Sequence, residues 1–307
     1  MSLRRLLQEI RYPSRMRFVV AMALAAPVLA VVACNGLLGI EDRPLRPDED
    51  ASVAPPDAAP FDASVSDSPA SLDAPTDAVP DGASTRDPCP SDAGARMVFA
   101  GAVCIDSTEV TRAQYAAFLA SKPTVASAPP ECAFKTSFVP SAEWPPPAGT
   151  EARPVIYVDW CDATAYCKWA GKRVCGSRQG GPLQTTQGNS TTSQWYYACS
   201  NDGLRGFPYG PTYQPKACNG IDVEAGAPMP VASLASCDAG FGGLFDMAGN
   251  VQEWFDGCDK VDGGAGANDS CLLGGGSFNL ANVGCNTVFV GPRSLTFFDL
   301  GIRCCGL

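Results

Sequence analysis

Two carboxylates, Asp246 and Glu253, stand at the ends of the segment D-M-A-G-N-V-Q-E. Gly249 lies between them, and a turn through glycine lets both carboxylates and several backbone carbonyls, including that of Val251, converge on one point. Carboxylate and carbonyl oxygens are hard ligands of the kind that Ca²⁺ takes. The segment therefore predicts a calcium site, and a hydrogen-bonded Asx turn without a metal is the alternative.

The cysteine and histidine content excludes several kinds of chemistry. The chain has 15 cysteines and no histidine. Without an imidazole, Ser-His-Asp and Cys-His hydrolase schemes have no general base. Structural zinc sites usually contain closely spaced cysteine pairs, and because this chain has no C-x-x-C pair, the cysteines do not predict zinc binding.

The N-terminal segment predicts export and lipid anchoring. Residues 1–33 carry several arginines and then a chargeless apolar run, which ends in V-V-A-C at Cys34. This run is shorter than the roughly 20 residues that a membrane-spanning helix needs, and its end has the small-residue pattern of a bacterial lipoprotein signal. We expect a lipid on Cys34 that attaches the exported protein to a bacterial membrane, facing the periplasm or the cell surface. A plain membrane anchor is the alternative, and Met16 is an alternative start.

Composition divides the rest of the chain in two. Residues 34–88 consist mainly of Asp, Ala, Pro and Ser with almost no aromatic residues, so they bury too little apolar surface to offset the entropy of ordering. They predict a disordered tether, and residues 89–307 predict one globular domain. The net charge of −10 and the lack of a basic patch argue against nucleic-acid binding.

Once Cys34 is assigned to lipid, the remaining cysteines are even in number and all lie in the domain. An even number of cysteines in an exported domain favours a disulfide framework, because an oxidising compartment joins neighbouring thiols. Local spacing predicts three of the bridges: Cys89–Cys104, Cys218–Cys237 and Cys258–Cys271.

The start of the domain predicts a strand and then a helix. An apolar, strand-like stretch begins at Met97. Thr111 is a good helix N-cap, and Gln114 completes a capping box. Apolar residues then recur at helical spacing on one face, which predicts the first helix of the domain.

A second helix is predicted further along the chain. The segment P-V-I-Y-V-D-W, at residues 154–160, predicts a strand that leads into this helix. Asp159 or Cys161 lies near its N-cap, and Gly171 stops it. Residues 176–307 are glycine-rich and predict short strands and long loops, which would be marginally stable without disulfides.

Several short segments carry a resemblance to a known family. They are P-V-I-Y-V-D-W-C-D-A-T-A-Y-C-K-W-A-G-K-R (154–173), G-F-G-G-L-F-D-M-A-G-N-V-Q-E-W (240–254), G-G-G-S-F (274–278), Cys285, Arg293 and G-I-R-C-C (301–305). In this order they resemble the formylglycine-generating enzyme family, also called sulfatase-modifying factors, over about residues 98–307. The resemblance implies a disulfide-rich α+β fold, low in regular secondary structure and related to C-type lectins.

The resemblance also implies metal ligands. It assigns calcium to the side chains and carbonyls of Asp246, Gly249, Val251 and Glu253. It places the start of a second calcium site at Asn219, with either Asp222 or Glu224 closing it.

Cysteine oxidation in this family needs two thiolates after the G-G-S turn, because they bind Cu(I) as soft ligands and, with oxygen, convert a substrate cysteine into formylglycine. Counted from Ser277, the second position is Cys285, but the first is Leu280, which cannot bind copper. Gln252 and Ala281 also depart from the family pattern. Ser277 matches an active-site position, although a small hydroxyl residue also suits a tight turn.

The cysteine pairing bears on Cys285. The resemblance pairs Cys167 with Cys304 and Cys199 with the C-terminal region. A bridge between Cys199 and Cys285 leaves no cysteine over, whereas a free Cys285 thiolate leaves one unpaired. Four cysteines then remain for two further bridges: Cys132, Cys161, Cys175 and Cys305.

We therefore expect a lipid-anchored domain that has kept the fold and calcium of the family but has lost the copper pair and cysteine oxidation. One alternative is an active oxidase that uses Cys285 and Ser277 with copper. Another is a non-catalytic module that binds a peptide or a glycan through exposed aromatic residues. The candidate contacts are Trp144, Trp195, Tyr196 and Tyr209.

Overall fold

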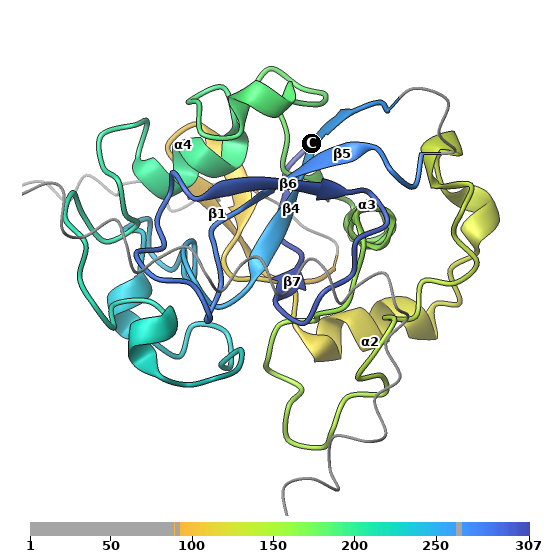
Figure 1. Cartoon of the computed structure of the whole chain (residues 1–307), viewed down its shortest axis with the longest axis horizontal. Coiled ribbons are helices and arrows are strands. Elements are labelled where there is room, and N and C mark those ends of the chain that lie inside the picture. The colour runs from red at the N-terminus through yellow and green to blue at the C-terminus, as the bar shows by residue number, and fades with distance from the viewer. Residues whose placement is uncertain (1–88, 90–92, 262–265) are drawn as a thin grey trace, which may run out of the picture. The chain divides into compact units, whose positions relative to one another are not determined.

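The computed structural model describes residue 89, residues 93–261 and residues 266–307 (Figure 1). The predicted signal, Cys34 and the predicted tether lie outside the described residues. Within the described part of the chain, no helix has the length and apolar character needed to cross a membrane.

Two small sheets organise the domain. The first has the order β1-β2-β8-β3, and the second has the order β6-β5-β4-β7. The strands of the first are β1 (Met97–Ala100), β2 (Val103–Asp106), β8 (Cys304–Cys305) and β3 (Arg173–Val174). Those of the second are β6 (Val288–Pro292), β5 (Ser270–Gly274), β4 (Gln252–Asp259) and β7 (Leu300–Gly301). In Figure 1 the helix α4 lies above these strands and α2 lies below them.

Three α-helices and five short 3-10 helices complete the regular structure of the described residues. The α-helices are α2 (Arg112–Ala120), α3 (Trp160–Trp169) and α4 (Gln194–Ser200). The 3-10 helices are Val125–Ser127, Pro130–Cys132, Thr185–Gln187, Ile221–Val223 and Ala235–Cys237. The rest is loop, so the predicted α+β class with little regular structure is confirmed.

Local capping explains where α2 and α3 begin. The Thr111 hydroxyl accepts from the Gln114 amide and the Gln114 side chain accepts from the Thr111 amide, which is the predicted capping box. At α3 the cap is Asp159, whose carboxylate accepts from the Asp162 amide at 2.9 Å, and Cys161 is already inside the helix. The chain leaves the helix through Gly171, which has a φ of 69°.

The strand predicted at residues 154–160 is wrong. Residues 154–159 form only an isolated bridge between Thr111 and Pro154, and Trp160 already belongs to α3. Tyr157 has a φ of 60°, which turns the backbone into the left-handed region and prevents a regular ladder. The apolar pattern there reflects burial under the helices, because Val155 and Val158 belong to the core around α2 and α3.

Seven disulfides tie the described domain together, and they use all the cysteines from Cys89 to Cys305. The three locally predicted bridges are confirmed, as are Cys167–Cys304 and Cys199–Cys285. The remaining four cysteines form Cys132–Cys161 and Cys175–Cys305. Such a framework indicates an oxidising compartment and hence an exported protein.

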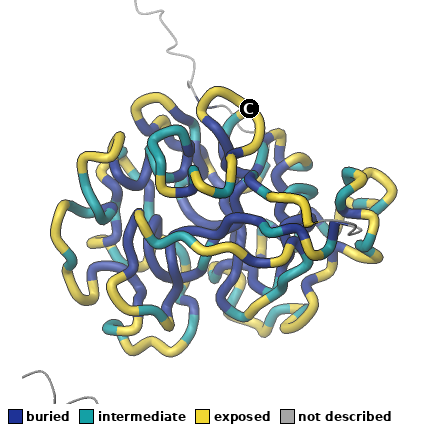
Figure 2. The backbone as a smooth tube through the Cα atoms, turned by 45° about the horizontal axis from the view of Figure 1, so that its top comes forward, coloured by how far each residue is buried: buried dark blue, intermediate teal, exposed yellow. Residues whose placement is uncertain are grey.

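The short strand β8 is the centre of this framework. It pairs with both β2 and β3, and its two residues, Cys304 and Cys305, are each bonded to a distant cysteine. Figure 2 shows that the buried backbone forms the interior of the domain and that the loops around it are exposed. The C-terminal segment is therefore part of the core and positions the residue before β8, Arg303.

Candidate functional site

Arg303 is the centre of the buried polar residues. Its side chain is fully buried, and its Nε donates to both carboxylate oxygens of Glu253 on β4, at 2.8 and 3.0 Å. Its Nη1 donates to the Asp106 carbonyl at 2.8 Å, and its Nη2 donates to the carbonyls of Phe245 and Asp246 at 2.9 and 3.2 Å. One guanidinium therefore joins β2, β4 and the turn at residue 246.

Both carboxylate oxygens of Glu253 already accept hydrogen bonds. Besides the contacts with Arg303, Oε2 accepts from the Trp195 indole at 2.5 Å. Trp195 is fully buried, so its prediction as a ligand contact is wrong. The positive charge beside Glu253 is that of Arg303, which leaves Glu253 poorly placed as the metal ligand predicted from the sequence.

Glu109 is a buried carboxylate that the sequence prediction missed. Its Oε1 accepts from Asn250 Nδ2 at 3.0 Å, but its Oε2 has no hydrogen-bond partner. Burial and the nearby Asp246 carboxylate raise the pKa of Glu109 well above its usual value. The local sequence D-S-T-E-V-T gave little signal, because a glutamate among polar residues is usually exposed.

An amide chain links Glu109 to the predicted second calcium site. Asn250 Oδ1 accepts from Asn219 Nδ2 at 3.0 Å and from the Met229 amide at 2.8 Å. Asn219 Oδ1 is also buried without a hydrogen-bond partner. Two unpartnered oxygens, one on Glu109 and one on Asn219, therefore belong to one hydrogen-bonded chain.

The predicted turn at Asp246 is present. Asp246 Oδ2 accepts from the Ala232 amide at 2.6 Å, and burial raises the pKa of Asp246 to about 6. Gly249 has a φ of 75°, and a Cβ there would lie 2.5 Å from the Asn219 carbonyl oxygen, so only glycine fits. The turn therefore brings the backbones of the first and second predicted calcium segments together.

The buried polar residues around Arg303 include more carboxylates than cations. The carboxylates are Asp106, Glu109, Asp246 and Glu253, and the cations are Lys172 and Arg303. Lys172 Nζ lies 2.6 Å from Asp106 Oδ1 and Arg303 pairs with Glu253, whereas Glu109 and Asp246 form no ion pair with any described residue. Among the described residues, no three Cys, Asp or Glu side chains are close enough to hold a metal by themselves. The unpartnered oxygens of Glu109 and Asn219 fit a cation that is also bound by amide or backbone oxygens.

The residues expected to close a second calcium site face elsewhere. The Asp222 carboxylate accepts from the Tyr213 hydroxyl. Glu224 is exposed at the end of a 3-10 helix. Asn219 instead contacts Asn250, so it joins the first site.

The two positions that correspond to the copper cysteines hold no thiolate. Cys285 is bonded to Cys199 with an S–S distance of 2.01 Å, and both residues are fully buried. Leu280 packs against a small apolar cluster that includes Val283 and Cys218. A Cu(I) ion has no sulfur ligand at either position, so the residues present do not fit copper.

Ser277 takes part in a separate polar network. Its Oγ lies 2.7 Å from Asp299 Oδ2 and 2.5 Å from Asn279 Oδ1. Gln252 Nε2 also donates to Asp299 Oδ2, at 3.4 Å. Ser277, the residue that the resemblance matches to an active-site position, is therefore held in hydrogen bonds with Asp299 and Asn279.

The other three predicted aromatic contacts do not form one surface. Trp144, Tyr196 and Tyr209 are half-buried, and each packs against a different apolar cluster. They act as parts of the core of the domain rather than as a shared platform for a peptide or a glycan.

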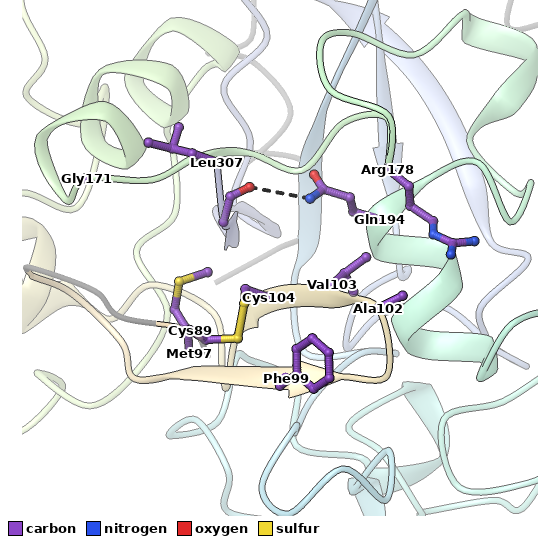
Figure 3. Close-up of a pocket in the computed structure, with 11 residues that line it drawn as sticks. Cys89, Met97, Phe99, Ala102, Val103, Cys104, Gly171, Arg178, Gln194 and Leu307 are labelled. Carbon is purple, nitrogen blue, oxygen red and sulfur yellow. Dashed lines mark hydrogen bonds between the residues drawn. A yellow bond between two sulfur atoms is a disulfide. The ribbon is translucent and has the colours of Figure 1, made fainter. Parts of the chain in front are cut away.

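A cleft of about 460 Å³ lies away from these residues, between β1, β2, α4 and the C-terminus (Figure 3). Phe99 and Leu307 reach its rim, and Gln194 Nε2 donates to the Gly306 carbonyl at 3.4 Å. None of the residues predicted to bind metal or copper lines this cleft, so it is separate from the polar core around Arg303.

Comparison with known proteins identifies a family match. The family described as "Sulfatase-modifying factor enzyme 1-like domain" matches residues 78–305. A formylglycine-generating enzyme from Mus musculus is 33% identical over 137 residues, which are 38% of this chain and 32% of the mouse protein. The chain thus matches about a third of that relative.

A second curated relative and a solved structure are also similar to this chain. A Mus musculus protein named inactive C-alpha-formylglycine-generating enzyme 2 is 32% identical over 133 residues, which are 38% of each chain. The crystal structure of CarF is similar to this chain with a TM-score of 0.45 and 22% identity, over 66% of this chain and 85% of that one.

Proposed function

Because the chain belongs to the sulfatase-modifying factor family of formylglycine-generating-enzyme-like domains, we propose that it keeps the family's framework without oxidising cysteine. The Cys199–Cys285 disulfide carries this proposal, since it removes the one cysteine that aligns with the copper pair. Leu280 at the other copper position supports it further. A similar mouse protein is itself named an inactive formylglycine-generating enzyme, which agrees with this proposal.

The test is an oxidation assay with a sulfatase-derived peptide that contains one cysteine. We expect no formylglycine by mass spectrometry when the oxidised protein, copper and oxygen are supplied, while a known formylglycine-generating enzyme converts the same peptide. The Leu280→Cys variant should also be inactive, because Cys285 remains bonded. Copper- and oxygen-dependent conversion by the native protein, together with two free thiols in the denatured unreduced chain, would contradict the proposal.

We further propose that calcium occupies the polar core beside Asp246. The Asp246 side chain, the free oxygen of Glu109 and the Asn219 amide oxygen would hold it, together with the carbonyls of Gly249 and Val251. The unpartnered oxygens on Glu109 and Asn219 support this ligand set. The ion would supply positive charge to a region whose buried carboxylates outnumber its cations.

Calcium should therefore raise the melting temperature, and a chelator should reverse the gain. A ligand at 100 times its dissociation constant stabilises a protein by about 2.7 kcal/mol. Glu109→Gln should remove the calcium dependence because it removes the free carboxylate oxygen. Glu224→Gln, at an exposed residue, is the matched control and should keep the dependence. Identical melting curves with calcium and with chelator would exclude the site.

We also propose that Cys34 carries a lipid that holds the exported domain at a bacterial membrane. The arginines and short apolar run before V-V-A-C support this proposal, and the disulfide framework agrees with an exported location. A lipid on Cys34 would place the family domain at the end of a long acidic tether.

A further inference from the structure

Asp299, just before β7, is a buried carboxylate without a basic partner. It is 2% exposed, and no lysine or arginine among the described residues forms an ion pair with it. Its Oδ1 has no hydrogen-bond partner. A buried negative charge is costly unless hydrogen bonds or a positive charge compensate it, and here one oxygen has neither.

The neighbouring side chains offer Asp299 only two donors, the Ser277 hydroxyl and the Gln252 amide, and both approach Oδ2. Ser277 Oγ lies between Asp299 Oδ2, at 2.7 Å, and Asn279 Oδ1, at 2.5 Å. A hydroxyl has one hydrogen, so Ser277 cannot donate to both. The Gln252 amide is a weak additional donor to Asp299 because the distance is 3.4 Å.

Flipping the Asn279 side-chain amide would place Nδ2 toward Ser277, and Nδ2 could then donate to the Ser277 hydroxyl. It would leave Asp299 Oδ1 without a hydrogen-bond partner and the carboxylate without an ion-pair partner among the described residues. A cation satisfies both requirements, since it is attracted to the carboxylate and accepts lone pairs from all three side chains.

We propose that Asp299, Ser277 and Asn279 form a binding site for a hard metal cation. Carboxylate, hydroxyl and amide oxygens are the ligand types that such cations take. Asn279 is exposed, so water at that side chain could complete the coordination of an ion. This site shares no residue with the proposed calcium site at Glu109 and Asp246.

The ligand charge indicates how tightly the ion binds. Asp299 is the single charged ligand, and cation affinity falls as the number of charged ligands falls. We therefore expect a dissociation constant of about 10⁻⁴–10⁻³ M for Ca²⁺, the range of weak extracellular sites. The inference rests on the proposed function in one respect, because it assigns an ion to Ser277, which matches an active-site position of the family's oxidases.

The experiment uses the full chain with its disulfides intact, in a Glu109→Gln background that silences the other proposed site. The protein is freed of metal with a chelator and kept in choline chloride at constant ionic strength. CaCl₂ or NaCl is then added, and melting temperature and heats of binding are measured. A response to both salts or to CaCl₂ alone indicates a site that takes divalent ions, and a response to NaCl alone indicates a monovalent site.

We expect the added ion to stabilise the Glu109→Gln protein and Asp299→Asn to abolish that response. Without metal, Asp299→Asn should melt at the same temperature as its parent or higher, because it removes a buried charge without changing shape. Asp202→Asn is the control, since Asp202 is exposed and asparagine tolerates its left-handed backbone. This control should keep the full response.

Two results would overturn the inference: no binding of either ion to the parent, or an equal response in Asp299→Asn. If Glu109→Gln does not fold, titration of the otherwise native chain replaces it, and Asp299→Asn must then lower the number of bound ions by one. The peptide oxidation assay distinguishes this inference from the proposed function. If the protein binds no ion and does not oxidise the peptide, only the cation site is refuted. If the protein oxidises the peptide, the proposed function is refuted.

Discussion

Replacing Arg303 with methionine should destabilise the domain by about 3–5 kcal/mol, the range measured when one partner of a buried ion pair is removed. The substitution leaves the Glu253 carboxylate buried without a positive charge. It also removes the donors to the carbonyls of Asp106, Phe245 and Asp246. Because these groups lie on β2, β4 and the turn between the sheets, the loss affects the whole domain rather than one loop.

Denaturant unfolding with the disulfides intact measures this effect. Arg303→Lys should recover little, because a lysine cannot reproduce the planar set of donors that contacts Glu253 and three carbonyls. Lys168→Met, at an exposed lysine of α3, should change stability by less than about 0.5 kcal/mol. Adding Glu253→Gln to Arg303→Met should restore part of the stability by removing the buried charge. A loss below about 1 kcal/mol in Arg303→Met would show that the guanidinium is not the compensating charge of this core.

Replacing Cys34 with alanine should abolish lipid attachment completely. The predicted lipoprotein signal needs the cysteine thiol as the acceptor, so no other residue of V-V-A-C can substitute for it. Cells that express Cys34→Ala and are fed a labelled fatty acid should contain unlabelled protein at the precursor mass. Ser52→Ala, in the predicted tether, should be labelled and processed like the native protein. Labelled Cys34→Ala protein would refute the lipid assignment.

The helix starts show what local sequence is able to predict. The partners in the Thr111–Gln114 capping box are three residues apart, so their contact requires only one turn of helix. The bridges Cys218–Cys237 and Cys258–Cys271 have sequence separations of 19 and 13, which short loops close without the rest of the fold. In both cases the two residues that interact belong to the same short segment of sequence from which their contact was predicted.

The strand predicted at residues 154–160 was wrong because distant contacts, and not local ones, set the conformation there. A short apolar run indicates burial, but it does not distinguish a strand from an extended segment packed under helices. Tyr157 adopts a left-handed backbone, and its amide donates to the Phe297 carbonyl at 3.0 Å, far along the chain. That contact, and not the local pattern, sets the conformation of the segment.

The candidate metal site was predicted in part. The spacing of Asp246 and Gly249 predicted the turn correctly, because glycine is required where a Cβ would meet the Asn219 carbonyl. The spacing did not reveal that Glu253 faces Arg303 or that Glu109 provides the free oxygen. Glu109 and Asn250 are 141 residues apart, and such a distant pair leaves no spacing pattern to read.

The amino-acid sequence by itself determined the family, the even number of cysteines in the domain, the helix caps and the leucine at position 280, on which part of the proposed function rests. These properties depend on residue identity or on neighbours within a few turns of chain. Only the tertiary structure decided which cation faces Glu253, that Cys285 is bonded to Cys199 within the core, and that Asp299 forms no ion pair with a described residue. These properties depend on which side chains meet after folding, and in the low-dielectric interior a buried charge is stabilised only by the groups that meet it there.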